Sequence, residues 1–180
     1  MGLSLNKRQV HIGATMRTST QTDEQEKTST VQINVSGVML DKGEPNELLG
    51  DQYASAALFN TRGKIEEPMF RQFRALPMRD KFDKCIARFY VGLNNEVVEL
   101  KGCKFSKIHI EPTTGGLTEV SMQVSGSPDS AQMARLFEAQ DSVQSASFRF
   151  GSAEKRKKDQ PELPLQDRAG GGDEHRPSVQ

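Results

Sequence analysis

The sequence contains no tryptophan, two tyrosines, three histidines and two cysteines among its 180 residues. This leaves little material for a metal centre: no two histidines have the spacing of metal ligands, and Cys85 and Cys103 are not part of a CxxC motif. We therefore expect no metal and no cofactor. Both cysteines lie in apolar alternating patterns, which favours buried free thiols in a reducing compartment over a disulfide.

An excess of charge of either sign is also missing, because lysine plus arginine equals aspartate plus glutamate at 24 each. The whole-chain charge therefore does not point to nucleic acid or to a membrane surface. The sequence has neither a long apolar run nor a basic start followed by apolar residues. We accordingly expect no membrane span and no cleaved signal peptide, which favours a cytoplasmic protein.

Hydrophobic residues make up only 34% of the chain, which is low for a fully packed protein. The deficit concentrates at the two ends. Residues 1–29 are polar and lack periodicity, and residues 152–180 are rich in charge, proline and glycine. The composition thus predicts one α+β domain over 30–151, between a disordered N-terminal arm and a disordered C-terminal tail.

The strongest pattern in that domain is a hairpin over residues 97–125. Val98 and Leu100, then Cys103 and Phe105, alternate with polar residues, as in a strand with one buried face. Gly102 interrupts the alternation and predicts a bulge, and a later phase shift predicts another near residue 106. A turn at residues 112–116 leads to a return strand in which Val120, Met122 and Val124 are apolar.

Similar patterns earlier in the chain suggest an internal repeat. The segments 31–92 and 97–150 each predict a β-β-α-β unit, with Gly37 at the position of Gly102. The expected fold is an antiparallel sheet with two short helices packed on it. The alternative is one α+β domain with two similar hairpins and no duplication. The expected elements are strands at 31–40, 82–91 and 143–150, a helix after Pro68, and a helix after Pro128 with Ser127 as its N-cap. Residues 52–59 could form a strand or a helix: their alanines favour a helix, but their position suggests a return strand.

None of the candidate catalytic arrangements has suitable spacing. Cys103 and His109 fall on one predicted strand, where adjacent positions do not build a catalytic triad. The Gly115-Gly116 turn joins two strands and lacks the helix N-terminus that would hold a phosphate. We therefore expect that the protein is not an enzyme.

A stretch between residues 62 and 90 suits nucleic acid better. Eight basic residues outnumber four acidic ones between Arg62 and Arg88, and five aromatic residues, Phe70, Phe73, Phe82, Phe89 and Tyr90, are interleaved with them. Cations with aromatic rings on a sheet suit a single strand. The alternative is that the phenylalanines form the core and the charges a solvated rim. The predicted binding residues are Arg62, Lys64, Arg71, Arg74, Arg79, Lys81, Lys84, Arg88 and Tyr90. Lys101, Lys104 and Lys107 form a second basic row on the solvent side of the hairpin.

The C-terminal tail contains a basic cluster at 155–158 followed by a short motif. Gln160, Leu163 and Leu165 resemble the peptide by which bacterial replication and repair proteins bind the sliding clamp. The segment departs from that pattern in having two prolines and in having Gln166 where phenylalanine is common. The resemblance implies the clamp, or another host protein, as a partner.

The block GCKFSKIHIEPTTGGLTEVSMQVSGSPDSAQMARLF lies within residues 97–150. It resembles small uncharacterised proteins of bacteriophages and bacterial mobile elements, which are often encoded among replication or recombination genes. The resemblance implies a bacterial host and supplies no catalytic residues. We expect a non-enzymatic accessory protein that binds nucleic acid, single strands above all, or a DNA-processing protein. The alternatives are a protein–protein module that inhibits a host enzyme or defence system, and a structural component of a virion.

Overall fold

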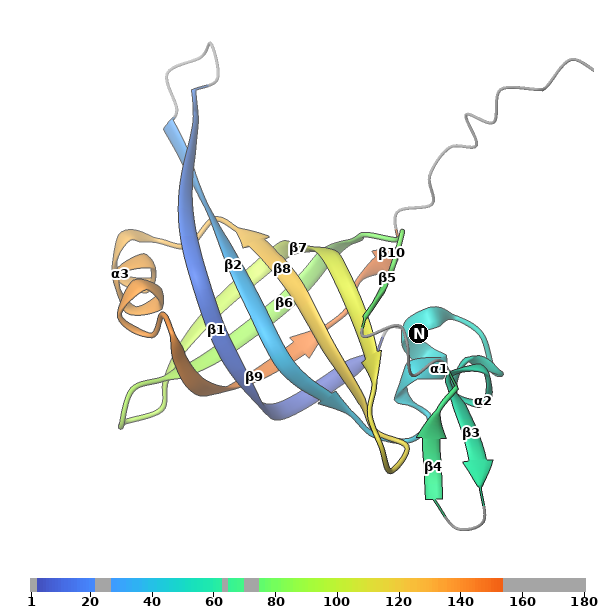
Figure 1. The fold of residues 1–180 in the computed structure, drawn as a ribbon. Helices are drawn as coiled ribbons and strands as arrows, with labels where there is room; N and C mark the ends of the chain where they lie inside the picture. The colour runs from blue at the N-terminus through green and yellow to red at the C-terminus, as the bar shows by residue number, and fades with distance from the viewer. Residues whose placement is uncertain (1–2, 22–26, 63–64, 70–74, 154–180) are drawn as a thin grey trace, which may run out of the picture.

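The computed structural model describes residues 3–21, 27–62, 65–69 and 75–153. Six long strands form a closed antiparallel barrel in the order β6-β9-β1-β2-β8-β7, with β7 pairing back to β6 (Figure 1). The expected α+β sheet with two short helices is therefore wrong. The barrel strands are β1 (Ser4–Gln21), β2 (Lys27–Leu40), β6 (Phe82–Val91), β7 (Glu96–Pro112), β8 (Thr118–Gly126) and β9 (Ser142–Arg149).

Shorter elements lie at the two rims of the barrel (Figure 1). One rim carries α3 (Ser130–Glu138), and the other carries α1 (Glu44–Leu49), α2 (Ala54–Leu58) and a small sheet of β3 (Phe59–Arg62) and β4 (Ile65–Pro68). Two short strands pair on the outside: β5 (Leu76–Pro77) with β7, and β10 (Ser152–Ala153) with β6. Within the described ranges, no helix is both long and apolar enough to cross a membrane.

The barrel interior is the hydrophobic core. Alternate residues of every barrel strand point inward and are buried, and three of the largest are Phe89, Phe105 and Phe148. The aromatic rings meet edge to face across β6, β7 and β9. Leu136 of α3 and Leu48 of α1 join this core from the two rims. Closing the sheet pairs each edge strand, so no long unpaired edge remains around the barrel body.

The first barrel strand, β1, lies where the sequence predicted a disordered arm. It pairs with β2 on one side and with β9 on the other, and it buries Leu3, Leu5, Val10 and Ile12. A bulge between Leu5 and Arg8 shifts the inward positions from odd to even numbers. That phase change hid the alternation in the sequence. The predicted tail after residue 153 lies outside the described residues.

The hairpin at 97–125 is confirmed as β7 and β8, including both predicted bulges. The register of β7 against β6 shifts beside Gly102, whose φ is +64°, and its register against β8 shifts between Ser106 and His109. The strands expected at 82–91 and 143–150 are confirmed by β6 and β9. Cys85 and Cys103 are both free and buried, as expected.

The predicted β-β-α-β repeat is wrong, because the two halves diverge after their first strand. In the second half β7 turns directly into β8, whereas β2 is followed by α1 and α2. The return strand expected at 52–59 is mostly helix α2. Gly37 and Gly102 do share a positive φ at a bulge, so their similarity reflects a local backbone requirement. The helix expected between Pro68 and Pro77 falls mostly on residues 70–74, which lie outside the described part, and Leu76 at its expected end belongs to the strand β5.

Helix α3 begins two residues later than the sequence suggested. Asp129, not Ser127, is the N-cap: its side chain accepts a hydrogen bond from the backbone N–H of Gln132 at 2.7 Å. The Gln132 side chain in turn accepts from the Asp129 N–H, which completes a capping box. Pro128 lies before the cap and fixes the entry of the chain into the helix.

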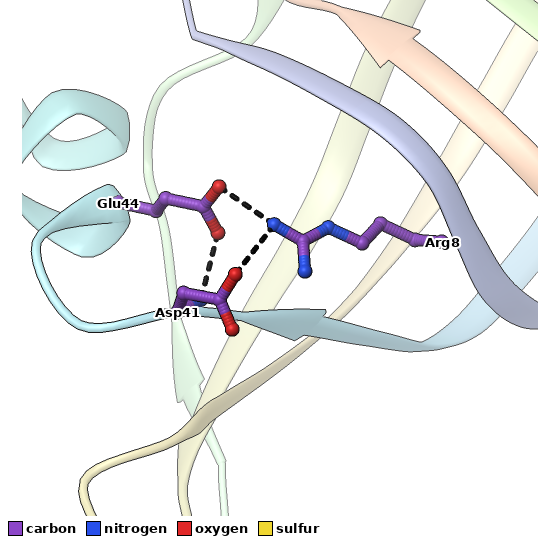
Figure 2. A network of polar contacts seen from close by, with 3 residues as sticks. All are labelled: Arg8, Asp41 and Glu44. Atoms are coloured by element: carbon purple, nitrogen blue, oxygen red, sulfur yellow. Dashed lines mark hydrogen bonds and ion pairs between the residues drawn. The ribbon is translucent and has the colours of Figure 1, made fainter.

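An ion-pair network of Arg8, Asp41 and Glu44 connects α1 to the barrel (Figure 2). The Arg8 guanidinium donates from one nitrogen to Asp41 and to Glu44, both at 2.8 Å. The second Glu44 oxygen accepts from the Asp41 backbone N–H at 2.7 Å. The hydrogen bond to Asp41 contributes most to raising the pKa of Arg8. One side chain of β1 therefore holds the end of β2 and the start of α1 together.

We expect Arg8→Met to lower the free energy of unfolding by roughly 1–2 kcal/mol, because it removes two charge-assisted hydrogen bonds and leaves two carboxylates facing each other. Urea denaturation measures the loss. Lys42→Met is the matched control: Lys42 pairs with Glu66 but is 75% exposed, so its loss should stay below about 0.5 kcal/mol. Equal losses in the two variants would show that the network contributes nothing beyond a surface pair.

Candidate nucleic-acid interface

The outer wall of the barrel has two chemically different sides. On β2 and β8 the outward side chains are mostly neutral and polar, including Gln32, Asn34, Ser121, Gln123 and Ser125, with Glu119 as a charged exception. On β7, β6, β9 and the start of β1 the outward side chains are mixed, and they include the cations Lys7, Lys84, Arg88, Lys101 and Arg149 as well as the carboxylates Asp83 and Glu99. The lysine and arginine side chains of the barrel wall therefore gather on this side more than on the β2–β8 side.

Strand β6 forms the middle of the cationic side. Its Ile86 lies opposite Arg149 of β9 and opposite Lys101 of β7. Neighbouring strands are about 5 Å apart, so these two cations flank Ile86 in one row across the wall. In the next rows Arg88 and then Tyr90 occupy the middle position on β6. The register of the barrel thus assembles cations from strands far apart in sequence.

We call this surface the cationic face, defined by five cations around Tyr90 and Ile86: Lys7, Lys84, Arg88, Lys101 and Arg149. The Lys7 ammonium lies 5.5 Å from the centroid of the Tyr90 ring, a cation–π contact. The backbone N–H of Lys7 donates to the Ser147 hydroxyl at 2.9 Å, which holds β1 against β9 at this point.

A single carboxylate lies within the rows of the cationic face. Glu99 pairs with Arg88 across β6 and β7, and with Lys101 at 3.1 Å. The hydrogen bond from Arg88 lowers the pKa of Glu99, and the same bond raises the pKa of Arg88. Glu99 therefore stays ionised and offsets one charge, and Asp83, next to Lys84, pairs with Lys104 at 3.0 Å, so the face keeps an excess of positive charge.

Two of these cations have a strained backbone. Lys7 and Lys84 have φ values of +45° and +56°, and each lies at a bulge of the barrel. Lys107 is similar, with φ +50° at a bulge of β7 outside the cationic face. A left-handed conformation costs roughly 1 kcal/mol for a residue with a Cβ, whereas glycine adopts it freely. Lysine at such a position therefore lowers the free energy of unfolding relative to glycine. Backbone strain of this kind concentrates at functional sites.

The structure brings together part of the predicted set. Lys84, Arg88 and Tyr90 lie on the cationic face. Arg79 and Lys81 are exposed in the segment between β5 and β6, and Arg62 ends β3 outside the barrel. The other predicted residues lie outside the described part of the chain: Lys64, Arg71 and Arg74, and the tail residues Gln160, Leu163 and Leu165.

The phenylalanines between these cations are not all on the surface. Phe82 and Phe89 point into the barrel and are buried, so for these two the core interpretation is correct. Tyr90 faces outward and is half-buried. Phe70 and Phe73 lie outside the described part of the chain. Of these aromatic residues, Tyr90 is therefore the one that the structure places on the cationic face.

Sequence reasoning missed two cations of the face. Arg149 stands between the inward-facing Phe148 and Phe150, so strand alternation alone places it outward. Lys7 left no comparable signal, because it occupies the bulge that breaks the alternation of β1. Lys101 was recognised as part of a separate basic row, and the pairing of β7 with β6 joins it to the face.

The other candidate chemistries do not come together in the fold. Cys103 is buried inside the barrel, whereas His109 is exposed on the outside, so the two face opposite sides of β7. The described residues contain no group of three or more histidine, cysteine, aspartate or glutamate side chains placed to hold a metal ion.

No protein-family model, curated protein or solved structure matches this chain.

Proposed function

We propose that this protein is a non-enzymatic accessory protein that binds single-stranded nucleic acid on the cationic face. The observation that carries the proposal is the gathering of five cations from four strands on one side of the barrel, two of them at strained lysines. Lysine and arginine side chains neutralise phosphates and release counterions, which drives sequence-independent binding.

A single strand suits this face better than a duplex. Tyr90, Ile86 and Val97 face outward among the cations, and Val97 is 50% exposed. These side chains offer apolar contact to the flat faces of bases, which a duplex buries in its own stacks. Stacking on one aromatic ring contributes roughly 1–3 kcal/mol per base. The face therefore combines phosphate contacts with a small apolar and aromatic strip.

The strained lysines allow a test in which stability and binding change in opposite directions. Lys84→Gly removes a phosphate contact and relieves the positive φ, so we expect weaker binding without a loss of stability. The double variant Lys7→Gly/Lys84→Gly should lower the slope of log Kd against log salt by about 1.4 for a single-stranded 20-mer. Its free energy of unfolding should stay equal or rise by up to about 1 kcal/mol. Fluorescence anisotropy and urea denaturation measure the two quantities.

Lys107→Gly is the matched control, since it removes the same charge and relieves the same kind of φ outside the cationic face. It should gain the same stability and leave the salt slope nearly unchanged. Absence of saturable binding by the unaltered protein at low salt would contradict the proposed function. Equal slope changes in the Lys107 and Lys84 variants would contradict the placement of the site.

A further inference from the structure

A cavity of about 630 Å³ opens at the rim of the barrel that carries α1. Its apolar lining comes from Leu48 and Leu49 of α1, Phe82 and Ile86 of β6, and Phe150 after β9. Binding pockets for small organic groups typically have volumes of roughly 300–1,000 Å³ and a mostly apolar lining with a few polar groups. The size of this cavity falls within that range, and its lining combines these apolar side chains with charged and polar groups.

The cavity is continuous with the cationic face. Lys84, Ile86 and Arg149 line it and also belong to that face. A strand whose phosphates contact Lys84 and Arg149 therefore passes the mouth of the cavity. A base attached to the same backbone can enter between the apolar side chains of the cavity while its phosphate stays at the mouth beside Lys84 and Arg149.

Two carboxylates complete the lining, Glu47 of α1 and Asp80 of the segment before β6. In the ranges of the chain that the structure describes, neither forms an ion pair with Lys84, Arg149 or another cation. Both oxygens of each carboxylate therefore remain available to accept hydrogen bonds. Carboxylates beside an anion-binding face disfavour further phosphates, but they suit a neutral group that carries N–H donors.

We propose that this cavity receives one base of the bound strand and selects a base with an exocyclic amino group. The inference rests on the proposed function, because the cations that position the phosphate are those of the cationic face. An amino group, such as that of cytosine, donates to Glu47 or Asp80. Uracil presents a carbonyl oxygen at the same position and would face the carboxylates with an acceptor. Such a mismatch replaces a hydrogen bond by a contact between two acceptor oxygens, which is unfavourable.

Oligonucleotides of deoxycytidine and deoxyuridine, each of 12 residues, test this selection, since the two bases differ mainly in that amino group and in the protonation of the adjacent ring nitrogen. Fluorescence anisotropy at one fixed low salt concentration should give a Kd roughly tenfold lower for the cytosine strand. The double variant Glu47→Ala/Asp80→Ala, which removes both acceptor groups, should bring the ratio of the two Kd values close to one. Its affinity for both strands should not fall, because the substitution removes two negative charges.

Leu49→Trp provides an independent test, because the indole ring would fill the cavity without altering any charge. It should abolish the preference for cytosine and leave the salt dependence unchanged. Glu138→Gln, a loss of one carboxylate on α3 at the opposite rim, is the control and should leave the ratio as in the unaltered protein. Salt-dependent binding with equal Kd values for the two strands would overturn the base pocket alone. Failure to bind either strand would overturn the proposed function.

Discussion

Iodoacetamide at pH 8 should alkylate Cys103 in the folded protein at least about a thousandfold more slowly than in the unfolded chain. Cys103 is 1% exposed, and burial raises the pKa of its thiol to about 12, with the neighbouring Cys85 adding to the effect. Roughly one such thiol in 10⁴ is ionised at pH 8, against roughly one in four for a thiol of ordinary pKa. Because only the thiolate reacts, the difference in ionisation alone gives this factor.

Cys85 should be protected in the same way. It lies opposite Cys103 in the β6–β7 register, and burial raises its pKa although the Gly151 N–H donates to its sulfur at 3.3 Å. Mass spectrometry after timed labelling measures both rates, and the control is the same protein in 6 M guanidinium chloride. Labelling of either thiol in the folded state within tenfold of the unfolded rate would contradict the buried placement.

The raised pKa of Cys103 also fixes the sign of a pH effect on stability. Between pH about 8.5 and about 12 the unfolded thiol loses its proton while the folded one keeps it. The contribution of the Cys103 thiol to the free energy of unfolding is therefore fully present below pH about 8.5, and it is lost as the pH rises toward 12. Urea midpoints at pH 8, 9 and 10 should fall more steeply for the unaltered protein than for Cys103→Ala, which lacks the group.

The second large effect concerns the aromatic core. Phe148→Ala should lower the free energy of unfolding by about 3–5 kcal/mol, since it removes a fully buried ring and leaves a cavity in the barrel. The ring lies edge to face with Phe89 at 6.0 Å and with Phe105 at 5.9 Å between centroids. The substitution thus removes contacts that join β9 to β6 and β7. At roughly 2–4 °C per kcal/mol, the melting temperature should fall by about 6–20 °C.

Phe137→Ala makes the same chemical change on α3, where the ring is 40% exposed, and should cost less than about 1 kcal/mol. Chemical denaturation followed by circular dichroism compares the two variants. Similar losses would mean that the Phe148 ring does not occupy a packed interior, and the barrel closure described above would then be in doubt.

The candidate site was partly predictable from sequence. The basic stretch before residue 90 identified Lys84, Arg88 and Tyr90, because alternation along one strand assigns these residues to its outer side. Lys101 and Arg149 became part of the same face only through pairing of β6 with β7 and with β9. Those contacts join residues up to 63 positions apart in the sequence, as between Ile86 and Arg149. Local sequence patterns do not predict the pairing of strands that lie so far apart. The pocket beside α1 likewise combines segments that the sequence keeps separate.

The hairpin of β7 and β8, its bulges, the strands β6 and β9 and the helix after Pro128 can all be predicted from the sequence. Each of these depends on local alternation, on glycine at a positive φ, or on a capping residue, and local interactions suffice for them. By contrast, the strand Ser4–Gln21 and the closure of the sheet depend on contacts between distant segments. No local pattern indicates β1, because it is a polar segment with a bulge. It forms a strand because β2 and β9 pair with its backbone on both sides and bury its few apolar residues.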